Sequence, residues 1–235
     1  MPYKIEHADA LEWLAAQPSA CAQFVIYDPP YAVGSPVRGR EDGAAGSLFG
    51  PLSFLSRTLR EVARVLRPGG VCEVFADWRR LSDLGYVAST VGLRPAGCVA
   101  WIRNRPGTGG LVRSSWDPIL LVARGLPRAV DRAAVRNVCE TDEIEGDLGE
   151  TVGPRLWAPD EPLDDVVRAD YPTKRRHPYG KPEAVFAHVM RRCVKAGDIV
   201  LDPFAGSGAS ARAALALGAE WRGCDIDPDF VGDFG

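Results

Sequence analysis

The residues Asp28-Pro29-Pro30-Tyr31 follow the apolar run 24–27 and bring together a carboxylate, two prolines and an aromatic ring. Proline has no N–H, so the backbone around it presents carbonyl acceptors. These acceptors suit an NH₂ group, and the ring suits the flat face of a substrate. The tetrapeptide therefore fits the exocyclic amine of a nucleobase that has been flipped out of a helix. It also fits an ordinary turn at the end of a strand, because Asp and Pro are common there.

A second candidate site lies far downstream, after the apolar run 199–201. It reads Asp202-Pro203-Phe204-Ala205-Gly206-Ser207-Gly208 and leads into an Ala- and Leu-rich stretch over 209–217. The pattern predicts a strand, a glycine loop and a helix start, where close backbone approach and free N–H groups favour a ligand. A dinucleotide site would look similar, but the usual third glycine is missing. The next predicted strand, 220–225, ends in Asp225, about 20 residues beyond the loop, as ribose recognition requires.

Taken together, the tetrapeptide and the glycine loop resemble the amino-methyltransferases of DNA, which transfer a methyl group from S-adenosylmethionine to adenine N6 or cytosine N4. The tetrapeptide comes first, which is the permuted order of the beta class of that family. His177-Pro178-Tyr179-Gly180-Lys181-Pro182 is similar to the His-Pro-x-x-Lys-Pro element of this class. The segments 7–14, 101–103 and 116–122 also resemble elements of the class, so the resemblance covers almost the whole chain.

The resemblance implies a role for each matching residue. The catalytic residues would be Asp28, Pro29, Pro30 and Tyr31, with the amine held by Asp28 and a nearby carbonyl and the base stacked on Tyr31. The cofactor-binding residues would be Asp9, Asp28, Lys181, Asp202, Pro203, Phe204, Ala205, Gly206, Ser207, Gly208, Asp225 and Ile226. Asp225 would bind the ribose, although the family more often carries Glu there. Lys181 also fits a solvated lysine at the start of a helix.

The charge pattern leaves a nucleic-acid partner open. The net charge of −3 argues against a basic surface, because phosphate contacts need cations. However, seven arginines and only two acids lie between residues 99 and 136, whereas eleven acids and two arginines lie between 139 and 170. Such a run is often a solvated face. The expected DNA contacts are Arg38, Arg40, Arg103, Arg105, Arg113, Lys174, Arg175 and Arg176.

Strand and helix patterns alternate along the chain. We predict strands over 19–28, 71–76, 98–102, 119–123, 199–201 and 220–225, and helices over 52–66, 78–91, 183–194 and 209–217. The alternation predicts an α/β fold with a mostly parallel sheet, and the pair 98–102 and 119–123 predicts an antiparallel edge strand. The resemblance supplies the rest: a Rossmann-like methyltransferase fold, circularly permuted, with the catalytic motif before the cofactor motif.

Composition bounds the remaining expectations. A chain of 235 residues with 46% hydrophobic content can bury one core. We expect one domain over 1–235, with a loop at 32–51 and an inserted target-recognition region within about 103–176. The six cysteines show no Cys-x-x-Cys spacing, so we expect reduced thiols and no metal site. Without a signal peptide or an 18-residue apolar run, we expect a cytoplasmic protein of a bacterial or phage-infected cell with no membrane partner.

The resemblance implies double-stranded DNA as the partner, with a homodimer as the assembly to test. Because Asp opens the tetrapeptide, adenine N6 is the favoured target and cytosine N4 is the alternative. A non-catalytic DNA-binding subunit with a vestigial cofactor pocket is a second alternative. Methylation of RNA or of a protein side-chain amide is a third.

Overall fold

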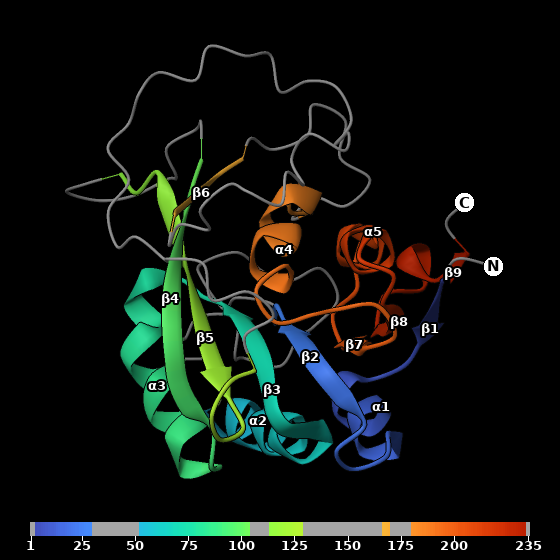
Figure 1. Ribbon diagram of the computed structural model, residues 1–235, viewed down its shortest axis with the longest axis horizontal. Helices are drawn as coiled ribbons and strands as arrows, with labels where there is room; N and C mark the ends of the chain where they lie inside the picture. Colours follow the sequence, from blue (N-terminus) through green and yellow to red (C-terminus); the bar gives the residue numbers. More distant parts are fainter. Residues whose placement is uncertain (1–2, 30–51, 104–112, 129–165, 170–179, 234–235) are drawn as a thin grey trace, which may run out of the picture.

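One sheet runs through the molecule, and helices lie on both of its faces (Figure 1). The computed structural model describes residues 3–29, 52–103, 113–128, 166–169 and 180–233. Within these residues the strand order is β6-β4-β5-β3-β2-β7-β8-β1-β9. The strands are β1 (Lys4–His7), β2 (Ala22–Tyr27), β3 (Leu66–Phe75), β4 (Arg94–Ile102), β5 (Trp116–Ala123), β6 (Val166–Arg168), β7 (Ile199–Asp202), β8 (Glu220–Asp225) and β9 (Gly232–Asp233). The helices are α1 (Ala10–Ala16), α2 (Leu52–Val65), α3 (Leu81–Thr90), α4 (Glu183–Met190) and α5 (Ala209–Ala216), with two short 3₁₀ helices, η2 (Trp78–Arg80) and η4 (Pro228–Phe230).

The sheet is mostly parallel, as predicted. The strands β3, β2, β7, β8 and β1 pair in parallel, and β6 is parallel to β4. The edge strand β9 is antiparallel to β1. The predicted strand pair, β4 and β5, is also antiparallel, but β5 lies inside the sheet between β3 and β4, and β6 lies outside the pair. The prediction of an α/β fold with a mostly parallel sheet is therefore confirmed, and an antiparallel edge strand is present, but it is β9 and not a strand of the predicted pair.

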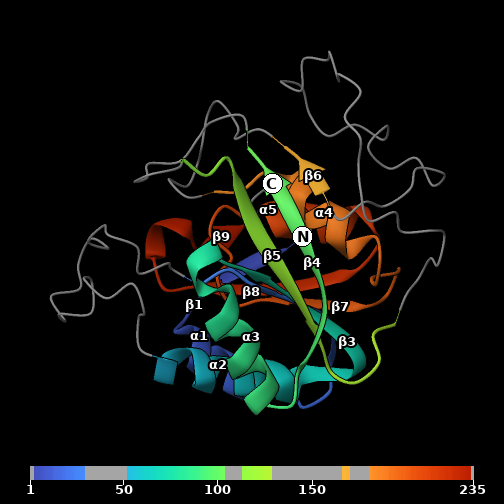
Figure 2. The same ribbon diagram turned by 90° about the vertical axis from the view of Figure 1, so that its left-hand side faces the viewer.

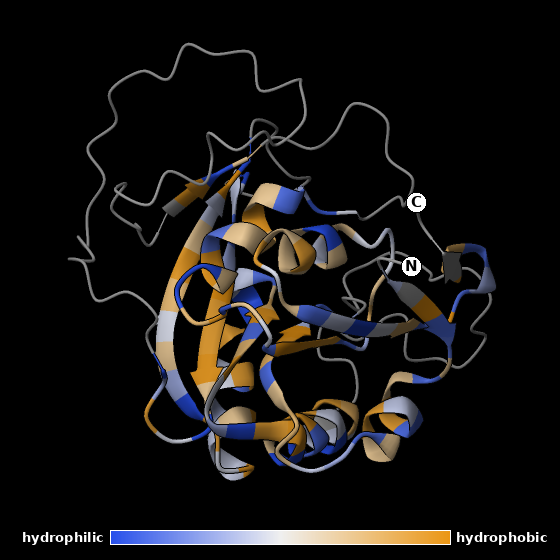
Figure 3. Cartoon of the chain, turned by 45° about the vertical axis from the view of Figure 1, so that its right-hand side comes forward, coloured by the Kyte–Doolittle hydropathy of each residue, from blue (hydrophilic) through white to orange (hydrophobic). Residues whose placement is uncertain are grey.

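Two hydrophobic cores occupy the two faces of the sheet. The helices α1, α2 and α3 cover one face, and α4 and α5 cover the other (Figures 1 and 2). Along β2, Phe24 and Ile26 belong to the core under α4 and α5, whereas Val25 and Tyr27 belong to the core over α2. A strand buried on both faces is typical of the centre of a parallel sheet, and hydrophobic residues follow the central strands in Figure 3.

The predicted elements occur with shifted ends. The helix predicted over 52–66 is α2, in which Leu55, Leu59 and Val62 recur at helical spacing and are buried. The strand predicted over 71–76 begins earlier, at Leu66, and runs through Pro68-Gly69-Gly70. The segment predicted as one helix over 78–91 is η2 followed by α3, and the helix predicted over 183–194 ends at Met190. The sequence did not predict β1, α1, β6 and β9.

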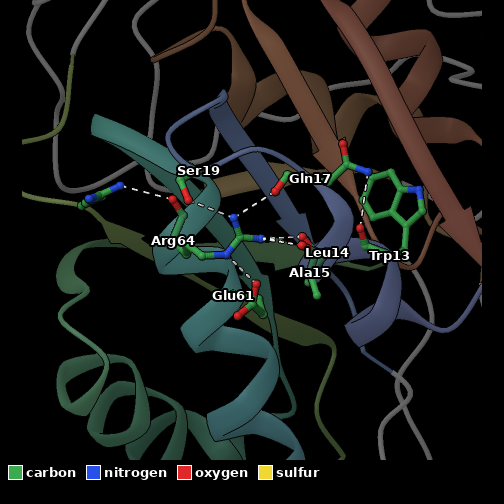
Figure 4. Close-up of polar contacts among 8 residues, drawn as sticks. Trp13, Leu14, Ala15, Gln17, Ser19, Glu61 and Arg64 are labelled. Carbon is green, nitrogen blue, oxygen red and sulfur yellow. Dashed lines mark hydrogen bonds and ion pairs between the residues drawn. The ribbon is translucent and has the colours of Figure 1, made fainter.

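A single arginine joins α1 to α2 and fixes the chain as it enters β2 (Figure 4). Arg64 of α2 donates to the carbonyls of Leu14 (2.8 Å), Ala15 (3.3 Å) and Gln17 (2.9 Å) at the end of α1. Its guanidinium also pairs with Glu61 at 2.7 Å. The last carbonyls of a helix have no partner within the helix, so these bonds stabilise the end of α1. The start of the strand that leads to Asp28 is thereby held against α2.

Within the residues that the structure describes, no helix is both long enough and apolar enough to cross a membrane.

Candidate active site

Three acidic residues lie where neighbouring parallel strands end. Asp28 follows β2, Asp202 is the last residue of β7, and Asp225 is the last residue of β8. These three strands are adjacent and parallel, so their carboxyl ends meet at one edge of the sheet. Open α/β sheets bind their ligands at this edge. The fold therefore brings together the two motifs that the sequence places far apart.

Asp28 forms an ion pair with Lys181, which lies just before α4. The side chains are 19% and 8% exposed, so water reaches neither freely. The Lys181 ammonium also lies 4.7 Å from the centre of the Phe75 ring, at the end of β3, in a cation–π contact. Lys181 is thus a buried partner of the tetrapeptide, and its reading as a solvated lysine at a helix start is wrong.

The glycine loop is held by Asp202 at its base. This carboxylate is 2% exposed and accepts hydrogen bonds from the Phe204 N–H (3.0 Å) and the Ser210 hydroxyl (2.5 Å). Burial raises the pKa of Asp202 to about 7, although both hydrogen bonds oppose the shift. Asp202 therefore fixes the shape of the loop from inside the protein.

Two glycines give the loop its backbone conformation. Gly206 and Gly208 have φ of +49° and +70°, in the region that side-chain-bearing residues rarely adopt. A Cβ on Gly208 would lie 3.1 Å from the Tyr3 ring, and Gly208 is the N-cap of α5. Both positions thus favour glycine, Gly206 for its φ and Gly208 for its φ and for the close approach of Tyr3, and the loop leads directly into the N-terminus of α5.

Asp225 closes the other side of the loop. One carboxylate oxygen accepts from the Gly206 N–H at 2.8 Å, and the other accepts from the Asp227 N–H at 2.9 Å. A carboxylate has about four acceptor positions, so these bonds leave capacity for a ligand hydroxyl. Asp225 thus shapes the loop, and its contact with ribose stays a prediction.

The other predicted cofactor residues lie around this loop. Phe204 is half-buried and packs edge-to-face on Tyr27, with ring centres 5.3 Å apart, while Pro203 and Ala205 are buried and Ser207 is half-buried. Ile226 is 59% exposed directly after Asp225. Asp9 caps α1 by accepting from the Leu11 N–H at 2.9 Å, so one of its oxygens has a structural task. No geometry here assigns these residues to a cofactor, and their roles stay predictions.

Most of the predicted base and DNA contacts fall outside the described residues. Pro29 is buried next to Asp28. The residues outside the description are Pro30, Tyr31, Arg38, Arg40, Arg105, Lys174, Arg175 and Arg176. Arg113 is exposed. Arg103 pairs with Asp117 at 3.1 Å and donates to the Ser114 carbonyl at 2.9 Å, so its described contacts join the ends of β4 and β5.

Two acids near this edge were not predicted from the sequence. Glu73, inside β3, is fully buried, and its pKa is raised well above the usual range. Burial is the largest cause, the charges of Asp28 and Asp202 add to it, and Lys181 opposes it. Asp117, at the start of β5, has a pKa raised by burial and lowered by Arg103 and Lys181. A single acid in the run 71–75 was the only signal for Glu73. No sequence spacing marks it as a neighbour of Asp28.

His, Cys, Asp and Glu side chains of the described segments form no group of three that could hold a metal ion.

Comparisons with known proteins agree on one family. Residues 22–233 match a family model for N6/N4 methyltransferases, described as DNA methylase. The chain is 24% identical over 244 residues to the DNA adenine methyltransferase YhdJ of Escherichia coli (strain K12), covering 97% of this chain and 79% of that protein. The crystal structure of the M1.HpyAVI–SAM complex has a TM-score of 0.62 at 19% identity, over 97% of this chain and 95% of that chain. The cytosine-N4-specific PvuII DNA methyltransferase has a TM-score of 0.68 at 15% identity, over 97% and 85%. At these identities the two structures establish a shared fold.

Proposed function

The chain belongs to the N6/N4 family of DNA methylases, and we propose that it methylates N6 of adenine in double-stranded DNA after the base has been flipped out of the helix. It is a DNA methyltransferase whose methyl donor is S-adenosylmethionine. The observation that supports methyl transfer to an amine is the pairing of β2 with β7, which brings the end of β2 beside the glycine loop. Adenine is favoured over cytosine because Asp opens the tetrapeptide. Two ligands can then bind side by side at this edge of the sheet, with the methyl donor at the glycine loop and the methyl acceptor at Asp28.

The residues at the loop fit S-adenosylmethionine. When bound, the cofactor supplies a methyl group that its positive sulfonium has already activated. Gly206 and Gly208 would let the backbone approach its methionine part, and Asp225 would accept from the ribose hydroxyls. Phe204 and the exposed Ile226 would flank its flat and apolar parts, and the second oxygen of Asp9 would accept from the adenine amine.

On the acceptor side, Asp28 would bind the amine of the target base. The lone pair of this nitrogen is delocalised into the ring, which makes the amine a poor nucleophile. Hydrogen bonds from the NH₂ group to Asp28 and to a carbonyl of the proline segment would draw the nitrogen toward sp³ geometry and aim its lone pair at the methyl group. Lys181 would orient the Asp28 carboxylate for this task through their ion pair. Tyr31 would stack on the base and offset part of the cost of unstacking.

The identity of the methylated base is the decisive test. Unmethylated plasmid DNA would be incubated with the protein and S-adenosylmethionine, digested to nucleosides and analysed by mass. We expect N6-methyladenine with the wild type and a loss of at least a hundredfold in its rate of formation with Asp28→Ala. A product of N4-methylcytosine would refute the adenine assignment and leave the family unchanged. Cofactor binding without any methyl transfer to DNA would refute the proposal and favour a non-catalytic subunit.

Competition with RNA and protein tests the third alternative. Single- and double-stranded DNA, RNA and a protein extract would be offered together with labelled S-adenosylmethionine. The proposal expects label in double-stranded DNA alone. Label that moves to RNA or to protein when DNA is present would contradict it.

We also propose that target recognition lies within about 103–176 and that the phosphates are contacted by the predicted basic residues, among them the exposed Arg113. A single phosphate contact contributes about 0.9 to the slope of log K against log salt for duplex DNA. Arg113→Ala should therefore weaken binding to all DNA sequences alike and reduce that slope by about one. A homodimer is the proposed assembly, and light scattering on the purified protein tests it directly.

A further inference from the structure

Glu73 is a buried carboxyl group for which the proposed mechanism has no use. It lies in the middle of β3 and has no exposed surface. Neither of its carboxyl oxygens has a hydrogen-bond partner among the described residues. Burying an unpaired polar group is costly, and burying an unpaired charge costs far more. A residue held at that cost beside an active site calls for a functional explanation.

The position of Glu73 connects it to both partners of the central ion pair. It lies opposite Ile26 of β2 in the sheet, two residues before Asp28. Along β3, Glu73 is two residues from both Val71 and Phe75, and residues spaced by two in a strand face the same side. Glu73 therefore faces the side of the sheet on which the Lys181 ammonium contacts the Phe75 ring. Glu73 therefore lies on the inner side of the Asp28–Lys181 pair, within the core between the sheet and α4.

The surroundings of Glu73 explain why it can hold a proton. Burial raises its pKa most, Asp28 and Asp202 raise it further, and Lys181 alone lowers it. Two thiols interact electrostatically with Glu73: Cys72, next to it on β3, and Cys193, after α4. Burial raises the pKa of both thiols, so both stay neutral. The side chains that α4 contributes to this core are apolar. The residue of β5 that pairs with Glu73 is Leu121, which is also apolar.

Net charge at the sheet edge changes when the methyl donor binds. Without it, Lys181 is the one cation acting on Glu73 among the described residues, against two acids. The sulfonium adds a second positive charge near Asp28 and the glycine loop. An added cation favours the ionised form of a nearby carboxyl group, and a low local dielectric strengthens this effect. The product, S-adenosylhomocysteine, has the same parts but carries no sulfonium charge.

We propose that Glu73 is a positioning residue that balances charge in the site: it carries a proton in the free protein and releases it to solvent when the cationic methyl donor binds. The inference rests on the cofactor assignment and not on which base is methylated. The ionised Glu73 then becomes a second counter-charge on the inner side of Lys181. This lets Asp28 share its acceptor capacity with the amine of the base. Loss of the methyl group removes the sulfonium charge, so Glu73 takes up a proton again and the site favours release of the product.

Titration calorimetry on the full chain tests the proposal without DNA. Binding of S-adenosylmethionine at pH 7 would be measured in two buffers with different ionisation enthalpies, which gives the number of protons released. We expect a measurable release, up to one proton, for S-adenosylmethionine and none for S-adenosylhomocysteine. By linkage, affinity for the cationic ligand should then rise by up to tenfold per pH unit, while that for the neutral one stays flat.

Variants separate Glu73 from other acids. Glu73→Gln keeps the shape of the side chain and should abolish both the proton release and the pH dependence of affinity, and Glu73→Leu serves if the amide does not fold. Glu12→Gln, on the exposed side of α1, should leave both unchanged. Equal proton release with both ligands, or release that persists in Glu73→Gln and disappears in Asp202→Asn, would overturn the proposal. Failure to bind either ligand would instead refute the cofactor assignment.

Discussion

The Asp28–Lys181 pair should be strongly coupled, and a double-mutant cycle can measure this. Removing one partner of a buried pair leaves an uncompensated charge and costs roughly 3–5 kcal/mol. Because Asp28 is 19% exposed, water can screen it in part, and we expect Lys181→Met to lower the free energy of unfolding by about 3 kcal/mol. Asp28→Asn should cost a similar amount, since it removes the carboxylate that pairs with the Lys181 ammonium in this largely buried place.

The double variant removes both charges and should cost less than the sum of the two single changes. We expect a coupling energy of about 2 kcal/mol, measured by urea unfolding at pH 7 with the slope of each curve compared. The pair Arg222–Glu220 is the control: it is also in direct contact, at 2.6 Å, but its side chains are 37% and 55% exposed. Its cycle should give under about 1 kcal/mol. Additive losses for Asp28 and Lys181, within about 0.5 kcal/mol, would show that the pair does not act as a unit.

Three further changes test other parts of the structure. Gly208→Ala should lower the free energy of unfolding by about 1–2 kcal/mol and weaken the binding of S-adenosylmethionine, measured by calorimetry. Gly197→Ala is the control, because Gly197 has a φ of +80° and no atom within 4 Å of a Cβ built there. It should lower the free energy of unfolding by a similar amount and leave the affinity unchanged. Arg64→Ala should lower the free energy of unfolding in urea by about 2–3 kcal/mol, because the carbonyls at the end of α1 lose their donors. Arg60→Ala, on the exposed face of α2, should lower it by under about 0.5 kcal/mol. Equal losses would contradict the role of Arg64 in stabilising the end of α1. The pKa of Glu73 is raised in the folded state, so as pH rises Glu73 ionises first in the unfolded chain. The free energy of unfolding of the wild type should therefore fall relative to that of Glu73→Gln as pH rises above 4.5, the ordinary pKa of a Glu side chain. A difference in stability between the two proteins that is the same at pH 5 and pH 8 would argue against this.

The sequence predicts those parts of the site that carry a local signal. The run 24–27 followed by Asp28-Pro29 contains its own strand end, and the run 199–201 followed by the glycine loop contains a strand, a turn and a helix start. In both cases neighbouring residues in the chain determine the local structure. The adjacency of the two motifs follows from their resemblance to one family, and the pairing of β2 with β7 agrees with it.

The elements that the sequence did not predict depend on distant partners. Residues 68–70 read as the end of a helix, yet they continue β3 because a β-bulge in the pairing with β2 brings Gln23 against them. The Gln23 side chain donates to the Gly69 carbonyl at 3.2 Å, and a Cβ on Gly70 would lie 2.9 Å from the Arg67 carbonyl. Gly70 is thus required by the close approach of neighbouring backbone, and Gly69 is favoured by its φ of +80°. The four residues of β1 are likewise a strand because β8 pairs with three of them and β9 pairs with Lys4.

The acids at the sheet edge and the basic residues of the connecting segments suit two separate tasks. The carboxylates of Asp28 and Asp225 make the centre of the site negative, and Asp202, whose pKa burial raises to about 7, adds part of a charge, with Lys181 paired to Asp28 as a compensating cation. A phosphate would be repelled there, whereas a cationic methyl donor and an NH₂ group are both attracted. In the proposed function, the DNA backbone would be held away from this centre and an extruded base would reach it. Under the proposed function, this explains why the chain can be acidic overall and still act on DNA: the affinity for phosphate and the chemistry on the amine occupy different parts of the surface.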